Sequence, residues 1–177
     1  MMQQRNWQGW ICAGLLAAFF ACGAAGSARA QAEAKDKSAS DVARITRCLT
    51  TLDRKNPDQE VYGSCLMTVA KPCITTTHAN PGTHAEIDCL DREREAWDAI
   101  VNTSYKAMMA ALDDEQKDKL RDMQRSWIQT RDLTCHFWYD YFQGTMANPM
   151  IAYCNNRETA RRAIYLRVFA TDIADRK

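Results

Sequence analysis

Six cysteines that follow residue 30 constrain the fold of this chain more than any other feature. The chain begins like an export signal, because Arg5 precedes an apolar run and Ala28-Arg29-Ala30 offers a small-residue cleavage site near Ala30. Exported proteins fold in an oxidising compartment, where an even number of cysteines is expected to form disulfides. Cys12 and Cys22 fall inside the signal. The remaining six predict a domain with three disulfides: Cys48, Cys65, Cys73, Cys89, Cys135 and Cys154.

A turn signal lies between the members of each neighbouring pair of these cysteines. The three signals are Asn56-Pro57, Pro81-Gly82 and Gly144. Six cysteines can pair in many ways, but the turns favour Cys48–Cys65, Cys73–Cys89 and Cys135–Cys154. Each pair would close a short loop and stabilise the fold by about 3 kcal/mol in the chain-entropy model.

The export signal also determines the net charge expected for the mature chain and the compartment in which we expect it to act. Removing residues 1–30 takes away Arg5 and Arg29 and no acidic residue, which changes the net charge from +1 to −1. A nearly neutral domain has no electrostatic reason to bind nucleic acid. The apolar run is shorter than the about 20 residues of a membrane span, so we predict a periplasmic or secreted protein without a span. A lipid-modified Cys22 is the alternative, which Ala21 suits and the preceding aromatic pair does not.

Apolar residues recur at helical spacing along most of the chain, and no stretch alternates as a strand would. Residues 31–39 are small, charged and aperiodic, so we expect a disordered leader there. Residues 40–83 are expected to form a cysteine-containing helical hairpin packed on the main domain. Its first helix ends before Asn56, its second ends near Ala70, and a polar stretch follows Pro72.

Two long helices should make up most of the main domain, residues 84–175. Thr83 with Glu86 and Asp113 with Gln116 form capping boxes for them, and the second ends at Gly144. Matched lengths and a very short linker predict a long antiparallel helix hairpin. The apolar stripes expected to face the core are Leu90, Trp97, Val101, Met108 and Leu112, then Leu120, Met123, Trp127, Ile128, Trp138 and Phe142.

The rest of the main domain is expected to be a loop and a final helix. The loop runs from Gln143 to Tyr153, and Asn155 with Glu158 would cap the helix. The acid-rich run Asp88–Glu95 on the first long helix is interpreted as a solvated face. The predicted fold class is therefore all-α, a small disulfide-stapled helical bundle.

The sequence contains no recognisable catalytic pattern. Its three histidines have no nucleophile motif beside them, and its seven glycines form no phosphate-binding loop. We therefore predict a protein that is not an enzyme and that needs no cofactor or metal. Zinc is the alternative, since Cys73, His78, His84 and Cys89 include its usual ligand types. Their spacing matches no standard finger, and in an oxidising compartment the cysteines would more readily pair.

A series of motifs runs from Ile87 to Leu166. It consists of Cys89, then Val101-Asn102 and Tyr105, then Trp127, Arg131-Asp132 and Cys135, then Cys154, Thr159, Arg162 and Leu166. In order and spacing these motifs resemble the LprI-like lysozyme inhibitor family, which has Leu at the position of Val101. The resemblance covers about half of the chain after residue 30.

The resemblance implies an exported bacterial protein of helical fold that inhibits lysozyme. The alternative is a non-catalytic periplasmic module that binds another exported protein or a peptidoglycan-related ligand. We expect a structural role for the polar and aromatic motif residues, Asn102, Tyr105, Trp127, Arg131, Asp132, Thr159 and Arg162, because buried polar groups must be paired.

An inhibitor has to reach the two carboxyl groups that flank the sugar bond in the lysozyme cleft. The loop from Gln143 to Tyr153 is the candidate inhibitory loop, since Cys135 and Cys154 would tether it. We expect it to present Gln143, Thr145 and Asn148. The segment Thr75–His84 is the second candidate.

Overall fold

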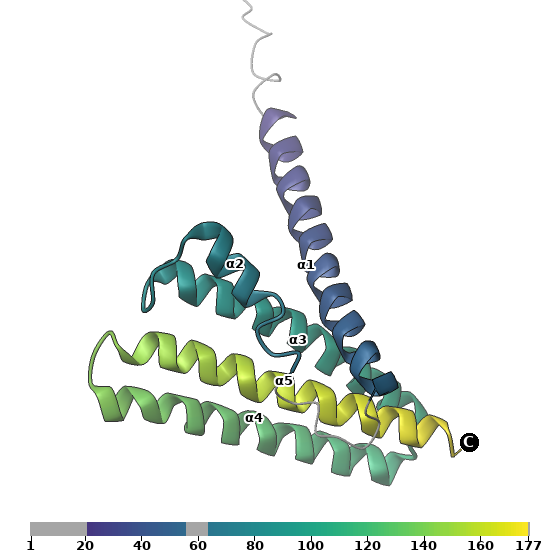
Figure 1. The fold of residues 1–177 in the computed structure, drawn as a ribbon. Helices are drawn as coiled ribbons and strands as arrows, with labels where there is room; N and C mark the ends of the chain where they lie inside the picture. The colour runs from purple at the N-terminus through teal and green to yellow at the C-terminus, as the bar shows by residue number, and fades with distance from the viewer. Residues whose placement is uncertain (1–20, 56–63, 177) are drawn as a thin grey trace, which may run out of the picture. The chain divides into compact units, whose positions relative to one another are not determined.

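A computed structural model describes residues 21–55 and 64–176. Five helices make up the described chain (Figure 1). They are α1 (Ala21–Lys55), α2 (Ala70–Thr77), α3 (His84–Ala111), α4 (Asp114–Phe142) and α5 (Ala147–Ala174). The described residues contain no strand, which confirms the all-α prediction. In the same ranges, no helix has a stretch both long and apolar enough to span a bilayer.

The chain divides into two compact units at Asp36, and α1 continues across the boundary. Residues 31–39, expected to be a disordered leader, lie within α1, and all their side chains are exposed. Their helix therefore depends on local hydrogen bonds rather than on burial. All features described below belong to the second unit, residues 37–177.

The core of this unit forms where α3 and α5 pack together. Trp97 and Met108 of α3 are fully buried, and α5 contributes Ala160, Ala163 and Leu166. Two alanines three residues apart leave little side-chain bulk, which lets α5 approach α3 closely. α5 also packs along α4 (Figure 1). These are the close pairings of the long helices, so the expected antiparallel hairpin of α3 with α4 stays a prediction.

Three disulfides tie the helices to one another. They join Cys48 to Cys65, Cys73 to Cys89 and Cys135 to Cys154, with Cα–Cα distances of 5.8, 5.6 and 5.4 Å. This is the pairing that the turn signals favour. The first two hold the segment from Ser64 to Thr77 between α1 and α3, and the third joins α4 to α5.

Two prolines lie inside helices where the sequence predicted none: Pro72 was expected to follow a helix end, and Pro149 lay in the predicted loop from Gln143 to Tyr153. α2 begins at Ala70, where the preceding helix was expected to end, so Pro72 lies in its first turn. α5 begins at Ala147, so Pro149 lies in its first turn as well. The first N–H groups of a helix have no intrahelical acceptor, so a proline there costs no hydrogen bond. The predicted helix from Asn56 to Ala70 lies partly outside the described residues, and the turns that occupy 64–69 contradict its remainder.

The earlier start of α5 overturns the prediction for its N-terminus. Asn155 and Glu158 lie in the helix interior, not at a cap, and Met146 is the N-cap residue. By contrast, Asp113 and Gln116 form the predicted capping box of α4. Thr83 accepts a hydrogen bond from the Glu86 N–H, but the Glu86 carboxylate accepts from the Gly82 N–H instead of closing the box.

The acid-rich run on α3 is solvated only in part, because Asp88 and Glu95 are exposed but Glu93 is fully buried. Its carboxylate accepts hydrogen bonds from five donors. They are the backbone N–H groups of Met67, Val69 and Ala70 at 2.7, 2.7 and 2.8 Å, Trp97 Nε1 at 3.2 Å and Asn156 Nδ2 at 3.1 Å. Glu93 therefore joins the turn before α2 to α3 and α5.

The neighbouring Arg92 makes a second interior contact. Its Nε and Nη2 atoms donate to the two carboxylate oxygens of Asp41 at 2.6 and 2.7 Å, and Asp41 is only 2% exposed. This bidentate pair holds α1 against α3, next to the buried Ile45.

Candidate functional site

The turn between α4 and α5 forms one end of the second unit (Figure 1). α4 ends at Phe142, and its C-cap residue, Gln143, has a left-handed backbone (φ 48°) and an N–H that donates to the Tyr139 carbonyl at 2.9 Å. The Ala147 and Asn148 N–H groups then bond to the Gly144 and Thr145 carbonyls. The connection is thus residues 143–146, far shorter than the loop predicted from Gln143 to Tyr153.

The three residues expected to act in inhibition are all exposed at this end. Gln143 and Thr145 lie in the turn, and Asn148 lies in the first turn of α5. In the described chain, none of their side chains has a hydrogen-bond partner. Their polar groups are available to another molecule. The buried Cys135–Cys154 disulfide braces the two helices behind them.

A cluster of four aromatic side chains, three of them exposed and Trp138 half-buried, lies on α4 just before the turn, and the sequence analysis missed it. Tyr141 is 67% and Phe137 59% exposed, and their rings stack at 6.4 Å. Trp138 stacks on Phe142 at 5.8 Å, and Phe142 meets Tyr141 edge-on at 5.0 Å. Phe142 was expected to face the core but is 41% exposed. We call these four residues, with the turn 143–146, the α4–α5 tip.

A signal for this cluster was present in the sequence. Residues 136–142 read His-Phe-Trp-Tyr-Asp-Tyr-Phe, so rings follow one another at consecutive positions. One buried stripe of a helix takes only three or four residues in every two turns. Most of such a run must therefore face away from the core. Ile128, also assigned to the buried stripe, is 39% exposed.

The second candidate segment, Thr75–His84, offers fewer free polar groups. The hydroxyls of Thr75, Thr76 and Thr77 donate back to carbonyls of their own helix. The disulfide between Cys73 and Cys89 also removes both thiolates of the alternative zinc site.

Motif residues from α3 and α4 meet across a groove of about 430 Å³, which we call the α3–α4 groove. Asn102 and Tyr105 line it from α3, and Trp127 and Arg131 from α4. Arg131 lies 5.0 Å from the centre of the Trp127 ring, and its guanidinium also donates to Asp132 at 2.8 and 2.9 Å. Asn102 donates to Asp98 of its own helix at 2.9 Å.

The motif residues on α5 are buried, and Arg162 contacts two residues that line this groove, Gln124 and Trp127. Thr159 is 1% and Arg162 9% exposed. Arg162 donates to the Gln124 side chain at 2.9 Å and lies 5.5 Å from the centre of the Trp127 ring. Burial lowers the pKa of its guanidinium. Arg162 thus joins α5 to α4, which supports a structural role for this residue.

A protein-family model described as "Lysozyme inhibitor LprI" matches residues 73–166 of the chain. The match includes α3, α4 and most of α5, and with them the α4–α5 tip and the α3–α4 groove. No curated protein and no solved structure gives a significant match.

Proposed function

Because the chain belongs to the LprI lysozyme inhibitor family, we propose that it inhibits lysozyme by inserting the α4–α5 tip into the lysozyme cleft. The exposed aromatic cluster beside a disulfide-braced turn is the observation that carries the proposal. The proposal implies a binding protein rather than a catalyst.

The polar groups of the turn suit the chemistry of the target. Lysozyme catalysis depends on two carboxyl groups flanking the sugar bond. Gln143 carries an amide and Thr145 a hydroxyl, and both can donate to a carboxylate. Because neither has a partner among residues 21–55 and 64–176, binding would not break an internal hydrogen bond.

The disulfide between Cys135 and Cys154 lowers the conformational entropy that the turn loses on binding. The Cys135 and Cys154 Cα atoms are 5.4 Å apart, and both side chains are buried. A turn that is already ordered loses less conformational freedom when it enters a cleft, so more of the contact energy appears as affinity.

The aromatic cluster supplies the apolar contact. Tyrosine and tryptophan are enriched among residues that dominate binding energy, and phenylalanine is enriched in interface centres. Only one charged residue, Asp140, lies among residues 133–146. Association should therefore depend on contact rather than on electrostatic steering, and its rate should change little with salt.

We further propose that the protein acts outside the cytoplasm, after cleavage of the signal near Ala30. Three disulfides among residues 48–154 suit an oxidising compartment.

The test is a lysozyme activity assay with the oxidised protein against chicken-type, goose-type and invertebrate-type enzymes. We expect dose-dependent inhibition of at least one type. Replacement of Gln143, Thr145 and Asn148 by alanine together should abolish it, with a melting curve close to that of the unchanged protein. Retained inhibition in this variant would reject the tip as the inhibitory element.

A second pair of variants tests the aromatic contact. Tyr141→Ala removes an exposed ring from the tip and should weaken inhibition. Tyr165→Ala is the matched control, because it removes a 45% exposed ring from α5, about 27 Å along the helix from the turn. Equal effects of the two variants would contradict the assignment. No inhibition of any lysozyme type would instead favour a module for another exported partner, sought by pull-down from envelope extract.

A further inference from the structure

We propose that the α3–α4 groove binds a short neutral oligosaccharide. The groove has a volume of about 430 Å³ and is lined by both helices. That volume is in the range of small-molecule sites. The site is distinct from the α4–α5 tip, because Arg131, which lines it, precedes Gln143 by about 18 Å along α4.

The groove combines apolar surface with unused hydrogen-bonding groups. Tyr105, Trp127 and Ile128 provide the apolar surface. Within the described residues, no partner is found for the Tyr105 hydroxyl, the Trp127 indole N–H or the side-chain carbonyl oxygen of Asn102. The groove therefore offers an indole donor, an amide acceptor and a hydroxyl that can do both.

A pyranose ring matches this combination. It has an apolar face of C–H groups, which can lie against an aromatic ring, and a rim of hydroxyls that both donate and accept. Asp98 adds carboxylate oxygens from α3, and Arg125 adds guanidinium N–H groups from α4. A purely apolar ligand would leave these groups unpaired, which is costly.

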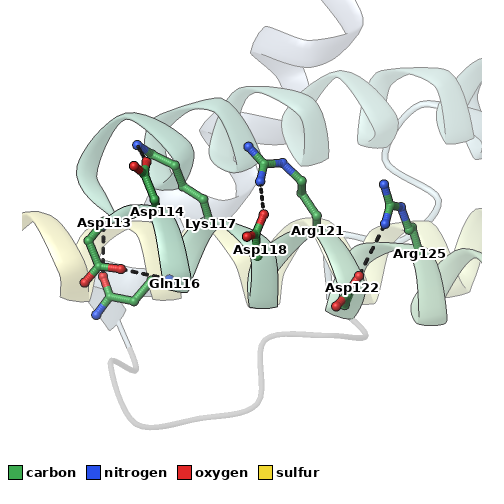
Figure 2. A network of polar contacts seen from close by, with 8 residues as sticks. All are labelled: Asp113, Asp114, Gln116, Lys117, Asp118, Arg121, Asp122 and Arg125. Carbon is green, nitrogen blue, oxygen red and sulfur yellow. Dashed lines mark hydrogen bonds and ion pairs between the residues drawn. The ribbon is translucent and has the colours of Figure 1, made fainter.

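The charges around the groove argue against an anionic ligand. Figure 2 shows Arg121 paired with Asp118 and Arg125 paired with Asp122 along α4. The third lining arginine, Arg131, is paired with Asp132 in the same way. The lining thus holds one carboxylate, Asp98, and three guanidinium groups, each of which is paired with a carboxylate of its own helix. An anion would have to displace these carboxylates, whereas a neutral sugar would not.

The side chain of Trp127, which lines the groove, is packed against the buried Arg162, and this favours binding without rearrangement of the ring. The guanidinium groups of Arg131 and Arg162 lie over the Trp127 ring, 5.0 and 5.5 Å from its centre. The sugar face would therefore lie against Tyr105, while Trp127 offers its indole N–H. Arg162 is mostly buried and bonded to Gln124, so it limits the movement of the ring. A pre-ordered wall loses little entropy on binding.

The experiment follows the tryptophan indole N–H signals of the full oxidised chain by two-dimensional NMR during titration with N,N′,N″-triacetylchitotriose. We expect a saturable shift of the Trp127 signal. The Trp97 signal should not move, because this indole is buried and bonded to Glu93. The Trp138 signal should not move either, because Trp138 lies in the α4–α5 tip.

Two substitutions on α3 make the test specific. Asn102→Ala should raise the dissociation constant about fivefold or more, the effect of losing one hydrogen bond. Thr103→Ala is the control, since Thr103 is the exposed neighbour whose hydroxyl donates to the Ala99 carbonyl. It should leave the dissociation constant unchanged.

Three results would overturn the proposal. The first is a Trp127 signal that stays in place up to the solubility limit of the sugar. The second is a shift of Trp138 without one of Trp127, which would place sugar binding at the α4–α5 tip. The third is a saturable Trp127 shift with inorganic sulfate and none with the trisaccharide. Lysozyme inhibition is measured separately with tip variants, so failure of either proposal leaves the other standing.

Discussion

Glu93→Gln is the substitution that tests most directly how this fold is held together. It changes one atom of a fully buried side chain and keeps its size. One carboxylate oxygen accepts from Met67 N, Trp97 Nε1 and Asn156 Nδ2, and the other accepts from Val69 N and Ala70 N. An amide has only one oxygen, so one of the two sets loses its acceptor and faces an NH₂ group.

The expected loss in the free energy of unfolding follows from the number of backbone and side-chain donors that Glu93→Gln leaves without an acceptor. The amide oxygen would serve the set of three, leaving the buried Val69 and Ala70 N–H groups unsatisfied. An unsatisfied buried donor costs about 1 to 3 kcal/mol, so we expect destabilisation of about 3 kcal/mol. Glu93→Leu leaves all five donors without this acceptor, and its cost should be about 5 kcal/mol or more.

Urea unfolding of the oxidised protein, followed by circular dichroism, gives the free energies of unfolding. Glu95→Gln is the matched control, since it makes the same chemical change two residues away on a side chain 71% exposed, and it should stay within about 0.5 kcal/mol of the parent. If Glu93→Gln unfolded at the same urea concentration as this control, the buried carboxylate would not be the acceptor that holds the turn before α2.

Three further predictions concern α4 and its brace. Replacing Cys135 and Cys154 by alanine together should cost about 3 kcal/mol, measured by urea unfolding, since the disulfide closes a loop with a separation of 19 residues; an unchanged midpoint would refute this. Trp127→Ala should cost about 2 to 3 kcal/mol by the same measurement, less than for a fully buried aromatic, because Trp127 is only half-buried; no loss would show that the ring does not support α4. Lys117 lowers the pKa of Asp114 by a hydrogen bond and by its charge, so the stabilisation is present above the unfolded-state pKa and is lost as pH falls through the folded-state pKa. Lys117→Met should therefore raise the Asp114 pKa in an NMR titration, and an unchanged value would exclude the pair shown in Figure 2.

Local interactions could be predicted from the sequence. The starts of α3 and α4 follow Thr83 and Asp113, because an N-cap bonds to a backbone N–H only three residues away. The disulfide pairs follow turn signals that lie between neighbouring cysteines in the sequence, so they too are nearly local. Proline was ambiguous even locally, since it both ends helices and begins them, and Pro72 and Pro149 begin them.

The burial of Glu93 could have been suspected, because position 93 falls on the apolar stripe of α3 between Leu90 and Trp97. Its acceptor role could not, since the donors are the backbone of a distant turn and a side chain of α5. The ion pair of Asp41 could not be predicted either, because its partner Arg92 lies 51 residues further along the chain.

By itself, the sequence determined the helical class, the cysteine pairing and the family motifs, since each depends on residue type and short spacing. Only the tertiary structure decided which motif residues face solvent. Asn102, Trp127 and Arg131 line an open groove, while Arg162 is buried. The physical reason is the packing of α5, whose small side chains allow it to lie close against α3 while it also packs on α4. Which face of a helix is buried depends on the neighbour that covers it, and helical periodicity carries no information about that neighbour.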